Sequence, residues 1–500
     1  MTPELKSYFD RYNVTETARS AVIAKSTMFI DGDFTDGAAT EALPVLEPST
    51  ASHLTELARG THSDVDAAVT AARRAFDEGP WPRMVPAERQ RILWKLADLI
   101  ERDADILAQI ETIDNGKAIG PCREFDVLGS VELLRYMGGW ATKIEGATRQ
   151  ISAGSDFFSY TVKEPIGVVG AITPWNWPMN MAFWKLAAPL AVGCTMVLKT
   201  AELTPLSMAY VARLMQEAGL PEGVFNIVTG HGHEVGAYLA AHPGIDKVSF
   251  TGSTRVGREV GTAAMSHFAP VTLELGGKSP MVAFEDADLE AVAEATRWSI
   301  FFNSGQNCSA GSRLYLHENI FEEGLEVIKS QITRMKLCPG LDPDCDIGPV
   351  ISAGAKASIE RYLDIGRDTA RTVFGGQKQT FEGFFVEPTL FAVEDNNSPL
   401  VQEEIFGPVL VALPFKDEAE VITKANHGPY GLAASVWSRN GARAQRVMRQ
   451  LKAGSVWINC HDVVDVTMPF GGVKESGFGK DLGREQIDHF LHTKAVTMAL

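Results

Sequence analysis

The chain has 500 residues and a mass of 54.3 kDa, which is too long for one ordinary hydrophobic core and predicts two or three domains. Hydrophobic residues make up 45% and charged residues 22%, so an intrinsically disordered protein is excluded. Lys and Arg total 46 against 63 Asp and Glu, which gives a formal net charge of −17. This acidic balance argues against a nucleic-acid partner, because no basic face is available to bind a phosphate backbone.

The cysteines and the apolar stretches indicate the compartment. No pair has C-x-x-C spacing, so neither a zinc ribbon nor a dense disulfide framework is expected. Residues 1–13 are too charged for a signal peptide, and the longest apolar stretch, 179–198, is broken by Lys185 and Pro189. We therefore expect a soluble, most simply cytoplasmic protein with no membrane partner. The six cysteines are Cys122, Cys194, Cys308, Cys338, Cys345 and Cys460.

The first 165 residues are predicted to contain helices and one hairpin. Helices are expected over residues 63–76 and 87–113, the second with Ile92, Leu96 and Ile100 on one face. Residues 143–165 alternate and are punctuated by glycine, which predicts an exposed hairpin, and residues 492–500 are also strand-like. Both elements need partners for their edges, and a neighbouring subunit is the simplest source.

The rest of the chain alternates strands with helices, as in open parallel sheets. The rhythm restarts after Gly276-Gly277, a candidate domain hinge, so the predicted class is α/β with two Rossmann-like open sheets and ligands beyond the strand ends. Helices are expected at 206–219 and 289–302. The expected strands are 167–172, 196–199, 224–228, 247–250, 271–275, 281–284, 313–317, 409–415, 433–437 and 455–459.

Three polar residues are candidates for chemistry. Cys308 lies among small polar residues where a ligand can reach a thiol, whereas Cys194 lies in an apolar run typical of structural cysteine. Glu274 ends a strand with apolar neighbours, which suits a general base, although a salt-bridged strand-end carboxylate is the plainer interpretation. Asn176 lies in a rigid turn after the first strand, where its amide either stabilises an oxyanion or satisfies the turn's own backbone.

Two glycine-rich turns are candidates for phosphate binding. Residues 230–236 follow a strand but depart from G-x-G-x-x-G by one residue, and residues 252–257 follow a strand and open a helix. Neither has the Gly-Lys-Ser/Thr of a P-loop, which argues against an ATPase, and each could be an ordinary strand-to-helix turn.

Taken together, the motifs resemble those of the aldehyde dehydrogenase superfamily over nearly the whole chain. Seven of them occur in the family's order, which makes the resemblance very specific. They are residues 174–178 (PWNWP), 199–202 (KTAE), 250–254 (FTGST), 273–278 (LELGGK), 305–308 (GQNC), 403–408 (EEIFGP) and 469–472 (PFGG).

The resemblance implies a mechanism that needs no metal. Cys308 would attack the aldehyde carbonyl to give a thiohemiacetal, with Asn176 and the Cys308 backbone N–H holding the oxyanion. Hydride would leave to a nicotinamide, and Glu274 would activate the water that hydrolyses the resulting thioester. Acyl transfer to coenzyme A and a non-catalytic role are alternatives, and the presence of Glu274 and Cys308 respectively counts against them.

The resemblance also implies an NAD site. Lys199 and Glu202 would bind the adenine ribose, Ser253 the pyrophosphate and Glu404 the nicotinamide ribose, with Phe406 beside the nicotinamide. Because the Glu202 carboxylate would repel a 2′-phosphate, NAD is expected to be preferred over NADP. Further expected cofactor contacts are Ile172, Thr173, Pro174, Trp175, Gly232, Gly252 and Gly276.

By the same resemblance, residues 1–142 and 166–276 would form the NAD-binding domain and residues 277–481 the catalytic domain. Residues 143–165 and 482–500 would form a small β oligomerisation element that builds a homodimer or homotetramer. Two positions depart from the common pattern. Thr200 replaces a frequent Pro, and Asp481 stands where many relatives have Glu, which puts a proton relay to Glu274 in doubt.

The expected substrate is an aldehyde with an apolar body. Trp177, Met181 and Trp184 are spaced for one face of a helix that starts beside Asn176. By resemblance Phe302, Val464 and Phe470 approach from the other side, and residues 459–470 are similar to phenylacetaldehyde-type dehydrogenases. Such a channel favours an aryl or arylalkyl aldehyde, with a medium-chain aliphatic aldehyde as the alternative.

Overall fold

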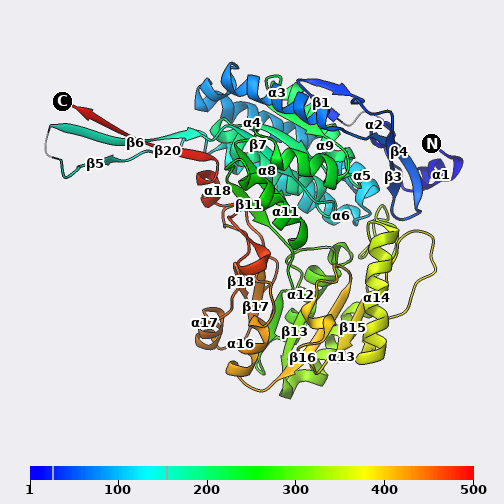
Figure 1. The fold of residues 1–500 in the computed structure, drawn as a ribbon. Helices are drawn as coiled ribbons and strands as arrows, with labels where there is room; N and C mark the ends of the chain where they lie inside the picture. Colours follow the sequence, from blue (N-terminus) through cyan, green and yellow to red (C-terminus); the bar gives the residue numbers. More distant parts are fainter. Residues whose placement is uncertain (25–27, 154–155) are drawn as a thin grey trace.

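The computed structural model describes residues 1–24, 28–153 and 156–500. Two open sheets lie in separate lobes, and a long β-ribbon projects from the larger lobe (Figure 1). The chain passes from one lobe to the other between β11 and β12, at Gly276-Gly277. The predicted α/β class with two open sheets is confirmed.

The larger lobe contains an eight-stranded sheet with the order β19-β11-β10-β7-β8-β9-β1-β2. Its central strands β7 to β11 are parallel, and helices cover both faces (Figure 1). The strands are β1 (Met28–Ile30), β2 (Asp33–Thr35), β7 (Val168–Ile172), β8 (Thr195–Lys199), β9 (Phe225–Val228), β10 (Lys247–Thr251), β11 (Val271–Glu274) and β19 (Gly477–Phe478).

The helices of this lobe alternate with its strands or precede them. They are α1 (Pro3–Arg11), α2 (Glu16–Val22), α3 (His62–Asp77), α4 (Pro86–Arg102), α5 (Ala104–Asn115), α6 (Ile119–Pro121), α7 (Gly129–Gly138), α8 (Pro178–Val192), α9 (Leu206–Ala218), α10 (Ala237–Ala241) and α11 (Thr254–Met265). A separate hairpin joins β3 (Ala42–Glu47) to β4 (Ser52–Ala58).

The smaller lobe contains a seven-stranded sheet with the order β14-β15-β16-β13-β12-β17-β18. Its strands are β12 (Pro280–Ala283), β13 (Arg313–His317), β14 (Arg371–Phe374), β15 (Thr389–Ala392), β16 (Val409–Phe415), β17 (Ala433–Trp437) and β18 (Ser455–Ile458). Its helices are α12 (Leu289–Thr296), α13 (Phe321–Thr333), α14 (Ala353–Thr369), α15 (Pro399–Gln402), α16 (Glu418–Asn426) and α17 (Gly441–Met448). After this sheet, β19 returns to the first lobe and pairs with β11.

Two helices differ from the sequence-based expectation. The helix predicted over 87–113 is two helices that break at Asp103, because the Asp103 carboxylate accepts from Arg102 and from the Tyr210 hydroxyl. The helix predicted over 289–302 ends its α-helical part at Thr296 and continues as a π-helical turn over Arg297–Phe301. This turn reorients the chain before the loop that carries Cys308.

Helix α8 anchors the larger lobe behind the site. Every one of its 15 residues is buried, as expected of a helix that is apolar on all sides. It packs against α7 and against β7 and β8, and it begins two residues after Asn176. The buried helix therefore fixes the turn that carries Asn176.

Within residues 1–24, 28–153 and 156–500, no helix combines the length and the apolar character that a membrane crossing requires.

The projecting ribbon is a three-stranded sheet with the order β20-β6-β5 (Figure 1). The C-terminal strand β20 (Leu491–Ala499) pairs antiparallel with all nine residues of β6 (Phe157–Pro165), and β5 (Thr148–Arg149) covers the other edge of β6. The hairpin predicted over 143–165 is formed by β5 and β6, and residues 154–155 lie outside the described part. Phe157, Phe158 and Met498 are exposed on this ribbon.

Deletion of residues 492–500 is expected to lower the assembly state or the solubility of the protein. The deletion removes the partner of β6 and leaves a long unpaired edge with exposed apolar side chains. Size-exclusion chromatography with light scattering measures the outcome, with deletion of Leu500 alone as the control. An unchanged mass and an unchanged solubility would contradict a role in assembly.

Candidate active site

The parallel register of the larger sheet aligns the candidate residues at one edge. Ile172 is opposite Lys199 on β8 and opposite Phe250 on β10. One residue further along, Thr251 is opposite Glu274 on β11. Four neighbouring strands therefore reach their carboxyl ends at the same level of the sheet, namely β8, β7, β10 and β11. The loops that follow them lie along one edge of the sheet, called here the rim.

The loop before Cys308 has a strained backbone. Asn303, Ser304 and Gly305 are consecutive residues with φ of 48°, 55° and 71°, a left-handed run that L-residues adopt only when their surroundings enforce it. The Ser304 hydroxyl donates to the Gly348 carbonyl at 2.5 Å, and the Gln306 amide donates to the Asn303 carbonyl at 3.1 Å. At Gly305 any Cβ would lie 2.1 Å from the Gly407 carbonyl oxygen, so glycine is required there.

Asn176 is connected to this loop across the lobe boundary. Its Nδ2 donates to the Gln306 carbonyl at 2.9 Å, and its own carbonyl accepts from Asn303 Nδ2 at 3.0 Å. The Asn176 side chain is buried, and its amide nitrogen carries two donors, of which Gln306 takes one. The second donor has no hydrogen-bond partner among the described residues.

Cys308 is partly exposed, and its thiol is surrounded by carboxylates. Burial of the thiol is the largest influence that raises its pKa, and the negative charges of Asp462, Glu274 and Glu404 raise it further. The thiol needs a base, or a change in its surroundings, before it becomes a thiolate.

Glu274 is buried at the end of β11. Within the described part of the chain, neither of its carboxylate oxygens has a hydrogen-bond partner of standard geometry. Burial and then the nearby Asp481 charge raise its pKa well above the usual carboxyl range. An added Cβ at Gly471 would lie 2.3 Å from Glu274 Oε1, so the glycine makes room for the carboxylate.

A buried cluster of charges lies behind Glu274. The Lys185 ammonium pairs with Asp481, and Gln486 Nε2 donates to the other Asp481 oxygen at 3.0 Å. Burial lowers the pKa of Lys247 to about 8, although the Asp481 charge opposes that change. Despite its shorter side chain, Asp481 is thus anchored from two sides and close enough to Glu274 to influence its pKa.

The residues expected to bind the adenine ribose and the pyrophosphate lie at or just after the ends of β8 and β10. Lys199 Nζ lies 2.8 Å from Glu202 Oε2. Burial raises the pKa of Glu202, but the Lys199 ammonium more than offsets this, and the net pKa is lowered. Ser253 caps α11 by accepting from the Val256 N–H at 3.4 Å, so the remaining N–H groups of this helix end face the same rim.

Gly232 and Gly252 lie in turns at this rim. A Cβ at Gly232 would meet no atom of the described residues within 4 Å, which leaves open space at the turn. A Cβ at Gly252 would clash with the Phe250 ring at 2.5 Å. The two turns therefore differ, because only at Gly252 is the glycine required by packing.

Glu404 and Phe406 lie at the seam between the lobes. Glu404 Oε1 accepts from the Gly277 N–H at 2.8 Å, and a Cβ at Gly276 would lie 2.4 Å from the carboxylate. Burial raises the pKa of Glu404 to about 7. The Phe406 ring, at a positive φ of 56°, packs edge-on against Trp175 with 5.4 Å between ring centroids.

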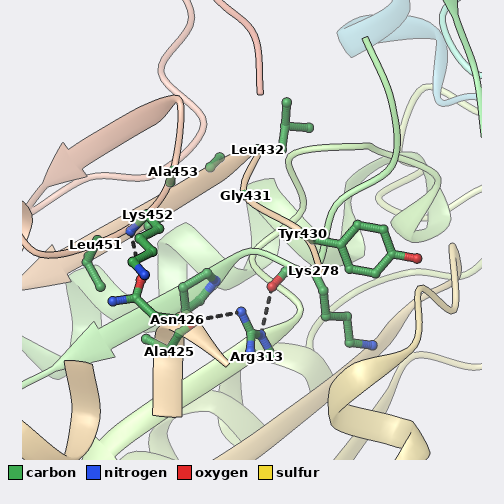
Figure 2. A pocket seen from close by; sticks show the side chains of 13 residues that line it. Lys278, Arg313, Ala425, Asn426, Tyr430, Gly431, Leu432, Leu451, Lys452 and Ala453 are labelled. Carbon is green, nitrogen blue, oxygen red and sulfur yellow. Dashed lines mark hydrogen bonds between the residues drawn. The ribbon is translucent and has the colours of Figure 1, made fainter. Parts of the chain in front are cut away.

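Lys278 follows these glycines and is a buried cation. Its Nζ has no hydrogen-bond partner among the described residues. Burial, with repulsion from Arg313, lowers the pKa of Lys278 to about 7. Figure 2 shows that Arg313 binds the backbone here, and its guanidinium donates to the carbonyls of Lys278 at 2.7 Å and Ala425 at 3.0 Å. Arg313 thus ties β13 to the start of β12.

The six candidate channel residues form two aromatic pairs and two flanking side chains. Trp177 lies 5.5 Å from Phe302, and Trp184 lies 5.2 Å from Phe470, measured between ring centroids. Met181 is buried on α8, and Val464 is exposed beyond β18. A cavity of about 250 Å³ lies on the outer side of Phe302, where Pro121, Arg297, Trp298 and Met335 contribute to its wall.

The buried cation Lys117, which lies against the Trp177 ring, was not predicted from the sequence. Lys117 Nζ lies 3.7 Å from the centroid of the Trp177 ring and 2.6 Å from Asp126 Oδ1, and both charged side chains are fully buried. The ammonium polarises the ring and holds it in place. The sequence signal was weak, because a lone Lys after Asn115-Gly116 is typical of a helix end.

His461 and Asp462 were given no role from the sequence, although the stretch that contains them was singled out there. Asp462 contacts both neighbours of Cys308, Asn307 and Ser309, and His461 contacts the Ser309 carbonyl. These contacts join residues more than 150 positions apart, which spacing alone does not reveal.

Comparison with known proteins identifies the family. The model of the aldehyde dehydrogenase family matches residues 34–496. An NAD+ complex structure of an aldehyde dehydrogenase from Bacillus cereus superposes with a TM-score of 0.93 and 41% identity, covering 100% of this chain and 99% of that one. The chain belongs to the aldehyde dehydrogenase family, and it is an oxidoreductase that acts on aldehydes.

Two curated relatives show a similar level of identity. The Arabidopsis thaliana protein "Aldehyde dehydrogenase family 2 member B4, mitochondrial" is 44% identical over 483 residues, which are 96% of this chain and 89% of the relative. The phenylacetaldehyde dehydrogenase of Pseudomonas fluorescens is 43% identical over 479 residues, which are 94% of this chain and 95% of that protein.

Proposed function

We propose that this enzyme oxidises an aryl or arylalkyl aldehyde to the carboxylic acid with NAD and water, through a covalent adduct on Cys308. The observation that carries the proposal is the convergence of Cys308, Asn176 and Glu274 at the rim where four parallel strands end. Asn176 is hydrogen-bonded to the loop of Cys308, and the Glu274 charge acts on the Cys308 thiol. The relatives named for aldehyde dehydrogenases support the same chemistry.

Cys308 acts as the nucleophile, and Asn176 holds the oxygen of the adduct. The thiolate adds to the aldehyde carbon, and the carbonyl oxygen becomes an alkoxide that accepts from the free Asn176 Nδ2–H and the Cys308 N–H. Both donors are fixed before the reaction, because the Asn176 amide is already oriented by Gln306. A thiolate suits both steps, because it adds to the aldehyde carbonyl and it also leaves readily from the thioester.

Glu274 acts as the general base that takes a proton from the hydrolytic water. Burial raises its pKa, so the ionised Glu274 is a stronger proton acceptor than an ordinary carboxylate. After hydrolysis the proton has a route towards Asp481 and Lys185, the charged pair that lies behind Glu274. Coenzyme A is not required in this scheme, because Glu274 supplies an activated water.

The rim residues fit a dinucleotide. Glu202, anchored by Lys199, offers its carboxylate to the adenine ribose hydroxyls, and the α11 N-terminus with Ser253 suits the pyrophosphate. Glu404 suits the nicotinamide ribose, with Phe406 and Trp175 beside it. Residues 172–174, Gly232, Gly252 and Gly276 line the same path. NAD, when bound, supplies the two-electron acceptor that converts the Cys308 adduct to a thioester.

Replacement of Glu202 by Gln is expected to relax the preference for NAD. A carboxylate repels a 2′-phosphate, and two charges about 4 Å apart interact by ~1–4 kcal/mol near a protein surface. We therefore expect the ratio of kcat/KM for NADP to that for NAD to rise on the order of tenfold. E222Q, at an exposed turn, is the control. An unchanged ratio in E202Q would contradict the assigned role.

Replacement of Glu274 by Gln is expected to stall the enzyme as a thioester. Formation of the thioester does not need an activated water, whereas its hydrolysis does, and a lost general base slows a step by roughly 100-fold or more. Rapid mixing should show a burst of NADH and then slow turnover, and C308A should show neither. The control is E259Q on the exposed face of α11. Normal steady-state turnover in E274Q would reassign the base.

The substrate body is proposed to be aromatic. Trp177 and Phe302 form one wall, Trp184 and Phe470 another, and Lys117 fixes the Trp177 ring from behind. A flat ring gains about 0.5–1.5 kcal/mol from each such contact beyond its area burial. The similarity to a phenylacetaldehyde dehydrogenase supports this class. Medium-chain aliphatic aldehydes are the second candidate, since the wall is apolar throughout.

The kcat/KM values for phenylacetaldehyde, benzaldehyde, hexanal, betaine aldehyde and succinic semialdehyde test the substrate class. We expect the aromatic aldehydes to be preferred, and W177A to reduce that preference over hexanal by roughly threefold to tenfold. W94A, on the exposed face of α4, is the control. Preference for a charged aldehyde would refute the apolar channel, and preference for hexanal would favour the second candidate.

We further propose the domain roles and the assembly. Residues 1–142 and 166–276 form the NAD-binding domain, and residues 143–165 and 482–500 the oligomerisation element. Residues 277–481 form the catalytic domain, although β19 within this range joins the sheet of the first lobe. The projecting β20-β6-β5 ribbon supports a homodimer or homotetramer, because its strand edges need a partner. We place the enzyme in the cytoplasm, as expected from the sequence.

A further inference from the structure

The segment after β18 reaches across to the nucleophile. Residues 459–465, named here the 459–465 loop, leave the end of β18 beside Ser309. Asn459 and Asp462 in this loop have positive φ angles of 55° and 60°. Such backbone persists only when the surrounding contacts enforce it.

The 459–465 loop is rigidly fixed on its own lobe. The Asn459 side chain accepts from the Ser438 N–H at 2.9 Å and donates to the Ser438 carbonyl at 3.1 Å. Trp457 Nε1 donates to the Val463 carbonyl at 2.8 Å. These three bonds hold the loop at both ends, so the residues between them have a defined position.

His461 connects this loop to the segment of Cys308 through a chain of donors. His461 Nε2 lies 3.0 Å from the Ser309 carbonyl, which only accepts, so Nε2 carries the proton. Nδ1 lies 2.9 Å from Ser435 Oγ, which in turn accepts from Trp437 Nε1 at 3.0 Å. Burial lowers the pKa of His461, so the ring is neutral and the Ser435 hydroxyl donates to Nδ1.

Asp462 contacts both sequence neighbours of Cys308. One carboxylate oxygen accepts from Ser309 Oγ at 2.5 Å, and the other accepts from Asn307 Nδ2. Burial raises the pKa of Asp462, whereas the bonds from Ser309 and Asn307 oppose that change and favour the carboxylate form. Charge-assisted bonds of this kind are the strongest that neutral donors make with a side chain.

The bond from Asn307 determines which end of its amide faces the thiol. With Nδ2 directed to Asp462, Asn307 Oδ1 lies 4.0 Å from Cys308 Sγ, where it accepts the S–H of a thiol. The same oxygen would repel a thiolate. The arrangement therefore favours the protonated form of Cys308 and holds its side chain in one direction.

The charged groups that face Cys308 come from three segments. They are Asp462 in the 459–465 loop, Glu274 at the end of β11 and Glu404 after α15, and all three are negative when ionised. Asp462 has the largest effect on the thiol of the three, and the Ser309 N–H opposes it. A substitution at Asp462 therefore changes the charge around Cys308 without touching the base or the cofactor residues.

We propose that Asp462 is a positioning residue that holds Cys308 as a resting thiol, by fixing Asn307 and Ser309 on either side of it. The proposal rests on the assignment of Cys308 as the nucleophile. In the resting protein the S–H proton stays on sulfur, directed at Asn307 Oδ1. Addition to the aldehyde then requires transfer of that proton from sulfur to a water molecule, and Glu274 is needed only for the later hydrolysis.

Alkylation of Cys308 tests the proposal without aldehyde or NAD. The rate of Cys308 modification by iodoacetamide is followed by peptide mass spectrometry between pH 6 and pH 9. D462N removes the charge but keeps the shape, so we expect alkylation about threefold to tenfold faster at a given pH, which corresponds to a thiolate fraction shifted by ~0.5–1 pH unit. D465N, on the exposed side of the same loop, should match the unmodified protein.

Steady-state kinetics separate position from charge. S309A removes one hydrogen bond and keeps the charge, so kcat should fall while the alkylation profile stays in place. D462A removes the negative charge and both hydrogen bonds of Asp462, so kcat should fall further than in D462N while KM for the aldehyde changes little. If D462A does not fold, D462N and S309A still carry the test.

Equal alkylation profiles for D462N, D465N and the unmodified protein would overturn the proposal. Slower alkylation in D462N would overturn it as well, because the carboxylate would then be assisting the thiolate. Failure of the proposed function is seen separately, since normal aldehyde turnover in C308S would remove the nucleophile assignment whatever the alkylation profiles show.

Discussion

The active site depends on the register of the parallel strands β8, β7, β10 and β11. Lys199, Ile172, Phe250 and Leu273 lie in one row across the sheet, so the residues just beyond that row meet at a single rim. A slip of one residue would turn the side chains of a strand to its opposite face. The row holds because these strands are buried on both faces, so each apolar side chain has one position that packs.

Burial of negative charge is the second constraint. Glu274, Glu404 and Asp462 face one thiol, and burial raises the pKa of all three carboxyls. The cations nearby do not neutralise this cluster, because Lys185 is paired with Asp481, and burial lowers the pKa of Lys278 to about 7. The three carboxyls and the burial of the thiol together keep the pKa of Cys308 raised.

The sequence allowed the class, the family and most strand positions to be predicted, because buried parallel strands are short apolar runs between turn residues. It also brought Asn176, Glu274 and Cys308 forward, since each is a polar residue at the end of an apolar segment. It failed where a side chain overrides the local pattern. The apolar spacing of residues 87–113 continues through Asp103, yet that carboxylate bonds to Arg102 and Tyr210 and ends the helix. Lys117 and Asp462 were missed because their partners lie in other segments.

The loop of Cys308 is held from both lobes, and this explains how its strained backbone persists. From the larger lobe, Asn176 exchanges hydrogen bonds with Asn303 and Gln306. From the smaller lobe, His461 and Asp462 bind Ser309 and Asn307. Left-handed residues cost of order 1–3 kcal/mol each, and such contacts are what offsets that cost. A shift of one lobe against the other would therefore break bonds on one side of Cys308 and leave those on the other side intact. Because the loop is attached to both lobes, the direction of the Cys308 thiol depends on how the two lobes are arranged.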